Sequence, residues 1–334
     1  MKPSERPGLI CLAGATATGK SEVALVLAER FAGEIISVDS MQVYRGLNIG
    51  TAKPAPADRD RVPHHLIDVV DLTETFDAAR FARLAHAAVN DIQARGKVAI
   101  LCGGTGFYFK AFLEGVGAAP PANAALRSEL ERVPLSELLG ELEAKDPATF
   151  AVIDRKNARR VIRAIEVIRL TGKPFSEQRA KWEGDASNLP VPGSRREEAQ
   201  IENGRSQRVP TSAAPAFFGL VREPQDLQTR INARVDLMFQ RGLVDEVREL
   251  LRLGLAENQT AMQAIGYRQV VEHLRGERPL AQTVELVKIR TRQFAKRQMT
   301  WFRRHANLNW LHVAPEATAE ATAAAIIEQL QTKG

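Results

Sequence analysis

Short apolar runs alternate with helical periodicity over the first third of the chain. Residues 9–13, 34–38 and 98–102 are runs that end at glycine or at polar residues, as buried strands of a parallel sheet do. Residues 20–31, 81–92 and 105–113 carry apolar side chains at helical spacing. Strands alternating with helices predict an α/β fold whose core is a parallel sheet flanked by helices.

The pattern changes after residue 117. Residues 126–170 show only helical periodicity, which predicts an inserted all-helical domain. Residues 184–215 are rich in proline, glycine and serine and have no aromatic residue, which predicts a flexible loop. Strands are expected again at 216–221 and 308–313, with helices over 226–274 and 280–304. We therefore divide the chain into a first part of the core at 8–117, an inserted helical domain at 118–183, a flexible loop at 184–215, and the rest of the core with C-terminal helices at 216–330.

Composition narrows the class of protein. The 334 residues are 44% hydrophobic and 26% charged, which excludes collagen-like, coiled-coil and wholly disordered chains. The net charge of +6 permits a polyanionic partner without requiring one. No apolar stretch approaches the roughly 18 residues of a membrane helix, so no membrane partner is expected. Two cysteines, Cys11 and Cys102, cannot form a disulfide framework, which favours the cytoplasm.

A phosphate-binding motif follows the first predicted strand and opens the first predicted helix. Its sequence, GATATGKS, fits the pattern G-x-x-x-x-G-K-[ST] in full. Backbone amides and the helix N-terminus attract a phosphate, the lysine adds a charge, and the serine hydroxyl can ligate Mg²⁺. The motif indicates a polyphosphate and does not distinguish ATP from a diphosphate. Its residues are Gly14, Ala15, Thr16, Ala17, Thr18, Gly19, Lys20 and Ser21.

Two strand ends carry further information. The strand at 98–102 ends in Gly103, Gly104 and Thr105, without the carboxylate that motor and switch ATPases place there. This favours a transferase that binds a diphosphate and uses the other end of its substrate. Asp39 closes the strand at 34–38 and is expected to face the bound substrate, as a general base or a metal ligand. A simple turn or capping aspartate is the alternative.

Several motifs together resemble the bacterial tRNA dimethylallyltransferases. They are ISVDS at 36–40, QVYRG at 42–46, IGTAKP at 49–54, PHHL at 63–66, GGTGFY at 103–108, IGYRQ at 265–269 and TRQFAKRQ at 291–298. The similarity covers about residues 9–183 and 216–312, with Ala15 where the family usually has proline. The family moves a dimethylallyl group from its diphosphate to N6 of the adenosine just 3′ of the anticodon, in tRNAs that read codons beginning with U. It has a P-loop-kinase-like core with an inserted helical domain.

The resemblance implies roles for individual residues. Residues 14–21 would hold the diphosphate of dimethylallyl diphosphate with Mg²⁺, Ser21 being the metal ligand. Asp39 would be the general base toward adenine N6, with Thr105 and Arg230 beside the phosphates. The alternative for Thr105 is that it only caps the following helix. The alternative for Arg230 is an exposed position on a helix. The residues implied in tRNA binding are Asp39, Ser40, Met41, Gln42, Thr105, Arg127, Arg159, Arg160, Val161, Ile162, Arg163, Gln263, Ala264, Ile265, Gly266, Tyr267 and Arg268.

Basic side chains gather in two segments, at 155–163 and 288–304, and no acidic residue occurs between 286 and 315. Both segments fit contacts with the phosphates of the anticodon stem-loop, the alternative being a solvated helix face. Tyr267 is equally consistent with a core position. We expect the chain to act on tRNA as a monomer.

Two other functions remain compatible with the motifs. One is a small-molecule kinase that uses ATP at the same phosphate loop, with the inserted domain as its lid. The other is a non-catalytic RNA-binding protein gated by a nucleotide, for which replacing Asp39 would leave activity unchanged.

Overall fold

The computed structural model describes residues 7–178 and 215–332. They form two compact units, one of residues 7–113 and 215–332 and the other of residues 114–178. Apart from Pro215, the predicted loop at 184–215 lies outside the described residues.

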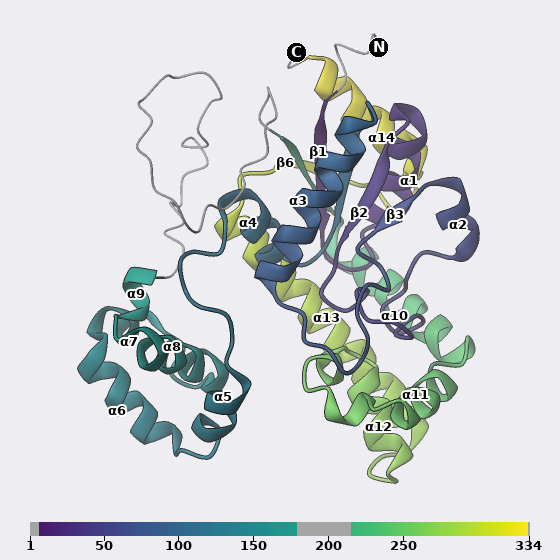
Figure 1. Ribbon diagram of the computed structural model, residues 1–334. Helices are drawn as coiled ribbons and strands as arrows, with labels where there is room; N and C mark the ends of the chain where they lie inside the picture. The colour runs from purple at the N-terminus through teal and green to yellow at the C-terminus, as the bar shows by residue number, and fades with distance from the viewer. Residues whose placement is uncertain (1–6, 179–214, 333–334) are drawn as a thin grey trace, which may run out of the picture. The chain divides into compact units, whose positions relative to one another are not determined.

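One sheet forms the centre of the first unit, and among the described residues all its strand pairings are parallel. In spatial order its strands are β3 (His64–His65), β2 (Glu34–Val38), β4 (Ala99–Gly103), β1 (Leu9–Gly14), β5 (Ala216–Val221) and β6 (Asn309–His312) (Figure 1). Three of the four inner strands, β2, β4 and β1, are buried along their whole length, because helices cover both faces of the sheet. The predicted α/β class is therefore confirmed.

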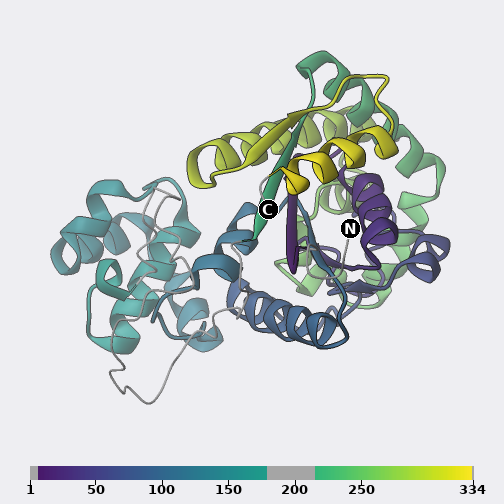
Figure 2. The same cartoon turned by 90° about the horizontal axis from the view of Figure 1, so that it is seen from above.

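Alternate residues of each strand pack against different helices. Ile10 and Leu12 of β1 belong to a buried cluster with α1 (Lys20–Phe31) and α14 (Ala319–Gln331), which lie beside each other in Figure 2. On the other helical layer, α3 (Ala78–Ala94) and α4 (Gly106–Glu114) meet where Phe81 stacks on Tyr108, with ring centroids 4.5 Å apart.

The C-terminal part of the first unit is helical up to β6. Its elements are α10 (Pro224–Gln240), α11 (Leu243–Arg252), the short 3₁₀ turns η3 (Leu255–Glu257) and η4 (Ala261–Gln263), α12 (Tyr267–Leu274) and α13 (Leu280–His305). Helices α10 and α13 pack against each other and bring Ile231 and Ala295 onto Ala15 of the phosphate loop. None of the described helices is both long enough and apolar enough to cross a membrane.

The second unit contains only helices in its described part. They are α5 (Ala124–Leu130), α6 (Leu135–Lys145), α7 (Pro147–Val152), α8 (Ala158–Thr171) and α9 (Phe175–Gln178). Leu138 and Leu142 of α6 pack on Val161 and Ile165 of α8, at the helical spacing that predicted the insertion. The unit begins after Leu113, within α4, slightly before the predicted boundary.

The five predicted strands are present as β1, β2, β4, β5 and β6. The short elements α2 (Pro56–Arg61) and β3 were not predicted. The helix α2 buries none of its residues and β3 has only two, so neither produces a hydrophobic pattern along the sequence.

Candidate active site

The phosphate loop connects β1 to α1 at the carboxyl edge of the sheet. Ala17 and Gly19 have φ angles of 66° and 93°, which curl the backbone tightly before Lys20 begins the helix. The Thr18 hydroxyl donates a 2.9 Å hydrogen bond to the Ala15 carbonyl across the turn. A Cβ atom at Gly14 would lie 2.8 Å from that hydroxyl oxygen, so this position requires glycine. The loop thus has the compact form that the motif predicts for phosphate binding.

Two arginines and a glutamine from distant segments hold the loop. Arg222 donates from Nε to the Thr18 carbonyl at 2.9 Å, and Arg230 donates from Nε to the Ala17 carbonyl at 3.0 Å. Gln298 accepts the backbone N–H of Thr16 through Oε1 at 2.9 Å. With two carbonyl oxygens occupied by guanidinium groups, positive charge is concentrated around the place where a diphosphate would bind.

Lys20 and Arg234 supply further positive charge. Burial lowers the pKa of Lys20, and the nearby charge of Arg234 adds to this, whereas Cys102, Asp39 and Glu22 oppose it. Burial likewise lowers the pKa of Arg234, and Asp39 opposes that shift. These mutual effects show that Lys20, Arg234 and Asp39 share one electrostatic environment. An anion bound there would favour the charged form of Lys20.

Sequence reasoning missed Arg234 and Arg222. Arg234 lies one helical turn after Arg230 on α10, so an i, i+4 comparison along that helix could have found it. Arg222 follows directly after β5, and the rule that singled out Asp39 at a strand end also applies to it.

Asp39 follows β2 and forms a turn with the residues after it. Its Oδ1 accepts the amides of Met41 and Gln42 at 2.8 and 3.2 Å. Among the described residues, no hydrogen bond is found to the second carboxylate oxygen, Oδ2. The turn role considered from the sequence is therefore real, and it leaves one oxygen of the carboxylate for a substrate.

Thr105 lies next to this turn. Its hydroxyl accepts the Ser40 amide at 3.3 Å, and its own amide donates to the Val38 carbonyl at 3.2 Å. A Cβ atom at Gly103 would lie 2.1 Å from the Val38 carbonyl oxygen, so glycine allows β4 to end this close to β2. The structure therefore brings Asp39 and Thr105 together beside the phosphate loop. It also confirms that the end of β4 carries no carboxylate.

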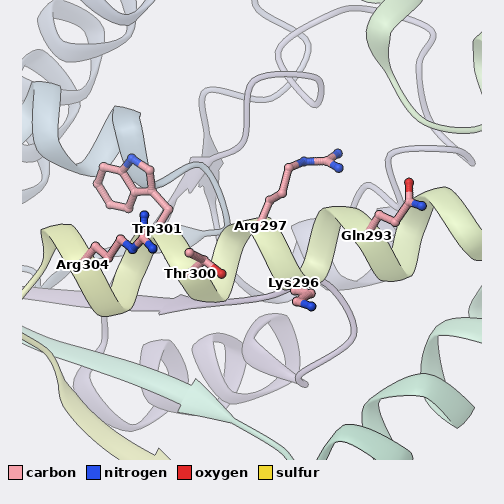
Figure 3. Close-up of a pocket in the computed structure, with 6 residues that line it drawn as sticks. All are labelled: Gln293, Lys296, Arg297, Thr300, Trp301 and Arg304. Carbon is pink, nitrogen blue, oxygen red and sulfur yellow. The ribbon is translucent and has the colours of Figure 1, made fainter. Parts of the chain in front are cut away.

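A basic hollow of about 440 Å³ lies along α13, lined by Gln293, Lys296, Arg297, Thr300, Trp301 and Arg304 (Figure 3). These side chains recur at helical spacing, so they form one face of α13, while Ala295, Gln298 and Phe302 are buried on the other. A Cβ atom at Gly106 would lie 2.0 Å from Trp301 Cε3. The indole therefore lies against the backbone that follows Thr105, which puts the hollow next to the site.

Comparison with known proteins identifies the group to which this chain belongs. The profile of the IPP transferase family matches residues 42–305. The chain is a member of the IPP transferase family. It is 42% identical to tRNA dimethylallyltransferase 2 of Geotalea uraniireducens, over 93% of this chain and 94% of that protein. It is also 42% identical to the tRNA dimethylallyltransferase of Geobacter metallireducens, with the same coverage of both chains.

Solved structures of the family agree with the fold. The tRNA isopentenylpyrophosphate transferase of Bacillus halodurans superposes with a TM-score of 0.66 at 35% identity, over 98% of both chains. A eukaryotic dimethylallyltransferase acting on tRNA gives a TM-score of 0.73 at 26% identity, covering 97% of this chain and 79% of that one. The resemblance inferred from the motifs is thereby confirmed.

In this IPP transferase, the segment implied in reading loop bases is only partly exposed. Tyr267 is 0% exposed, its hydroxyl donates to Glu246 at 2.6 Å, and it accepts the Gly50 amide at 3.1 Å. It therefore has the core position considered from the sequence and anchors the loop that follows Gln42. Ala264 is also buried, whereas Gln263 and Arg268 are exposed.

The residues beside Asp39 differ in how far their side chains are already engaged. The Gln42 carboxamide accepts from Ser37 Oγ at 2.8 Å and donates to the Thr51 carbonyl at 3.1 Å. Gln42 thus ties the end of β2 to a neighbouring loop. Ser40 and Met41 are partly exposed and lie on the same turn as Asp39.

The residues implied in the inserted unit fall into two groups. Arg127 and Arg163 form ion pairs at 3.0 and 2.6 Å with Glu166, whose side chain is fully buried. Val161 and Ile162 are buried in the core of the unit, so the structure places their side chains away from solvent. Arg159 and Arg160 are exposed at the start of α8. A sequence range cannot separate these groups, because helix faces alternate within it.

Few side chains of the described residues are available to ligate a metal ion. Among the described residues, no group of three His, Cys, Asp or Glu side chains could hold a metal ion. Ser21 is exposed at the first turn of α1, directly after Lys20. This fits Mg²⁺, which keeps most of its ligands as water and substrate phosphate oxygens and takes one or two from the protein.

Proposed function

We propose that this chain transfers a dimethylallyl group from dimethylallyl diphosphate to N6 of the adenosine that follows the anticodon on its 3′ side, in tRNAs that read codons beginning with U. The observation that carries the proposal is the pairing of a phosphate loop with Asp39 and Thr105, in a member of the IPP transferase family. A carboxylate beside bound diphosphate suits a transferase whose acceptor must lose a proton. A tRNA substrate also implies a cytoplasmic enzyme.

The donor's diphosphate is the leaving group, and the loop is arranged to receive its charge. The Thr16 amide donates to Gln298 and the Thr18 amide to Ala15. The other amides of the phosphate loop, the ammonium of Lys20 and the guanidinium of Arg234 are the groups proposed to stabilise the negative charge that develops as the allylic C–O bond breaks. Arg230 and Arg222 hold the loop through its carbonyl oxygens. We therefore assign the direct phosphate contact to Arg234 and the shaping of the loop to Arg230.

Ser21 is the one residue of the chain to which we assign Mg²⁺ binding. Ser21 would hold Mg²⁺ together with oxygens of the diphosphate, and the ion would neutralise part of the leaving group's charge. The chain's own contribution there is the position of the hydroxyl at the helix start.

At the acceptor side, Asp39 is the general base. The N6 amine is a weak nucleophile because its lone pair is delocalised into the ring. As N6 attacks the allylic carbon, the new C–N bond forms, the C–O bond breaks toward diphosphate, and a proton of N6 passes to Oδ2 of Asp39. Oδ1 stays bound to the Met41 and Gln42 amides, which keeps the carboxylate oriented. The hydroxyl of Thr105 fixes the same turn from the other side.

The adenosine must leave its stack to reach Asp39, and the free energy needed for this is small in a single-stranded loop, where the base is unpaired. We propose that Ser40, Met41, Gln263 and Arg268 touch the extruded base or its neighbours. The basic hollow of α13 binds RNA phosphates, with Lys296, Arg297 and Arg304 as the charged groups. In the inserted unit, Arg159 and Arg160 take the same role. All groups proposed for the reacting centre belong to one chain, so a monomer suffices.

A product assay tests the proposal. The pure protein is incubated with Mg²⁺, dimethylallyl diphosphate and an anticodon stem-loop, and the digested RNA is analysed by mass spectrometry. A nucleoside heavier than adenosine by one prenyl group is the expected result, and it should disappear when the adenosine 3′ of the anticodon is replaced by uridine. Absence of product, with ATP consumed over small acceptors in a parallel assay, would overturn the proposal in favour of a kinase.

A further inference from the structure

One buried glutamine joins the two halves of the proposed site. Gln298 on α13 is 8% exposed, and both ends of its carboxamide are hydrogen-bonded. Oε1 accepts the backbone N–H of Thr16 in the phosphate loop, and Nε2 donates to the backbone carbonyl of Gly104, each at 2.9 Å. The segments that it bridges belong to β1–α1 and to β4–α4, which are neighbours in the sheet.

The bridge depends on the shape of its partner. A Cβ atom at Gly104 would lie 2.2 Å from Nε2 of Gln298, and 3.3 Å from the Gly14 carbonyl oxygen. A Cβ atom at this position would push the carboxamide out of its present place. Gly104 and Gln298 are thus matched to each other.

Thr105, the residue after Gly104, contacts the turn that carries Asp39. Thr105 accepts the Ser40 amide, and Ser40 follows Asp39. A continuous path of hydrogen bonds and backbone therefore runs from Thr16 through Gln298, Gly104 and Thr105 to the turn of the proposed base. A carboxamide suits the central place, because its oxygen accepts from an N–H while its amide group donates to a C=O.

We infer that Gln298 is a positioning residue for prenyl transfer, which fixes the distance between the diphosphate loop and the Asp39–Thr105 pair. The inference rests on the proposed function. Attack at the allylic carbon requires N6 and that carbon to meet at about 3–3.5 Å and in line with the leaving oxygen. The donor is held by one loop and the acceptor by the other, so a link between the loops sets this geometry. Gln298 itself need not contact either substrate.

The test replaces Gln298 by methionine, which keeps the length and loses both hydrogen bonds. The single-turnover rate at saturating substrates should fall about 10- to 100-fold, because misplacement by a fraction of an ångström is costly to an in-line reaction. The dissociation constant for tRNA and the KM for the donor should change less than about threefold, and the melting temperature should fall by only a few degrees, the effect of two lost hydrogen bonds. The matched control is Gln282→Met, on an exposed position of the same helix.

A second variant breaks the same link from the other side. Gly104→Ala should displace the carboxamide and lower the single-turnover rate to a similar degree. If both act through one link, the double variant G104A/Q298M should be no slower than the slower single variant. Multiplied defects in the double variant would overturn the inference, as would an unchanged rate in Gln298→Met. A merely structural role would instead lower the melting temperature and tRNA affinity together. If the wild type forms no prenylated adenosine, the proposed function fails, and that result is distinct from an active wild type with an equally active Gln298→Met.

Discussion

The guanidinium of Arg222 donates a 2.9 Å hydrogen bond to the carbonyl oxygen of Thr18, although 204 positions separate the two residues along the chain. Arg222 is 7% exposed, and its other end pairs with Asp226 at 2.8 Å and with the Ala314 carbonyl at 3.1 Å. Through this one side chain the phosphate loop is tied to the start of α10 and to the segment after β6. The shape of the loop therefore depends on residues far outside its motif.

Replacing Arg222 by lysine should weaken donor binding. Lysine keeps the charge but cannot reach three partners in fixed directions, so the Thr18 carbonyl loses its support. We expect the KM for dimethylallyl diphosphate to rise about tenfold, equivalent to about 1.4 kcal/mol of lost interaction. Steady-state kinetics at saturating tRNA measure it, with Arg252→Lys at an exposed position of α11 as the control. A donor KM equal to that of the control would contradict this role.

Asp39→Asn should remove the base and keep the turn. The asparagine Oδ1 can still accept the Met41 and Gln42 amides, so the loop should hold its form. The single-turnover rate is expected to fall by about 10²- to 10⁴-fold, the usual contribution of a general base. Filter binding should show tRNA affinity within about twofold of the wild type. Asp71→Asn, at an exposed ion pair with Arg45, serves as the control. Normal chemistry with lost tRNA binding would refute the assignment.

Two arginines one helical turn apart should differ in their effects. Arg234→Gln removes a cation from the environment of Lys20 and Asp39, and kcat/KM should fall about 10²- to 10³-fold, as when a group that stabilises a transition-state charge is removed. Arg230→Gln loses one hydrogen bond to the Ala17 carbonyl, and a loss of about tenfold is expected. Steady-state assays on both variants decide the order. Equal losses in kcat/KM, or a larger loss in Arg230→Gln, would show that Arg230 contacts the phosphate.

Neutralising Lys296 and Arg297 together should weaken tRNA binding and flatten its salt dependence. Both line the basic hollow of α13, and the sequence around them has no acidic residue. The slope of log affinity against log salt should decrease by about 1.5, because each phosphate contact contributes about 0.7–0.9. Titrations of K296Q/R297Q at several salt concentrations measure it. The control is R248Q/R252Q, whose arginines already pair with acids on α11. An unchanged slope would remove this face from the interface.

Glu34→Gln should destabilise the sheet at the edge opposite the site. The carboxylate is 2% exposed and bonds to Arg95, to Lys97 at 2.8 Å and to His65 at 2.7 Å. Hydrogen bonds from Arg95, followed by those of Lys97 and His65, hold the pKa of Glu34 well below its usual range despite burial. We expect a loss of about 2 kcal/mol in unfolding free energy at pH 7.

The pH dependence of that loss has a definite sign. A carboxyl with a lowered folded-state pKa stabilises the fold above its unfolded pKa of about 4.3, and this stabilisation disappears as the pH falls. The difference between wild type and Glu34→Gln in urea unfolding should therefore be full at pH 7 and shrink toward pH 3. A difference that stays constant over this range would show that the carboxylate charge is not what stabilises the wild type.

The sequence was sufficient for the longer elements with a regular hydrophobic pattern and for the local phosphate-binding motif. Apolar runs predicted five of the six strands, and helical spacing predicted the inserted unit, because burial of one face imposes a period on consecutive residues. The phosphate loop could be recognised from the sequence, because its motif lies within eight consecutive residues. Asp39 was found because it follows a strand, and parallel strands bring their carboxyl ends to one edge, whereas the family resemblance implied the role of Thr105.

The tertiary structure decided which side chains of these segments reach the site. Arg234 shares its surroundings with Lys20, whereas Arg230 bonds the loop backbone. Tyr267 is buried against Glu246, and Arg127 is paired with Glu166. Gln298 bridges Thr16 and Gly104, at separations of 282 and 194 positions. The spacing of residues along the sequence determines which side chains share one face of a helix or strand. Which distant helix or strand packs against that face depends on the tertiary structure. The contacts that shape the site join distant elements, so only the folded chain determines them.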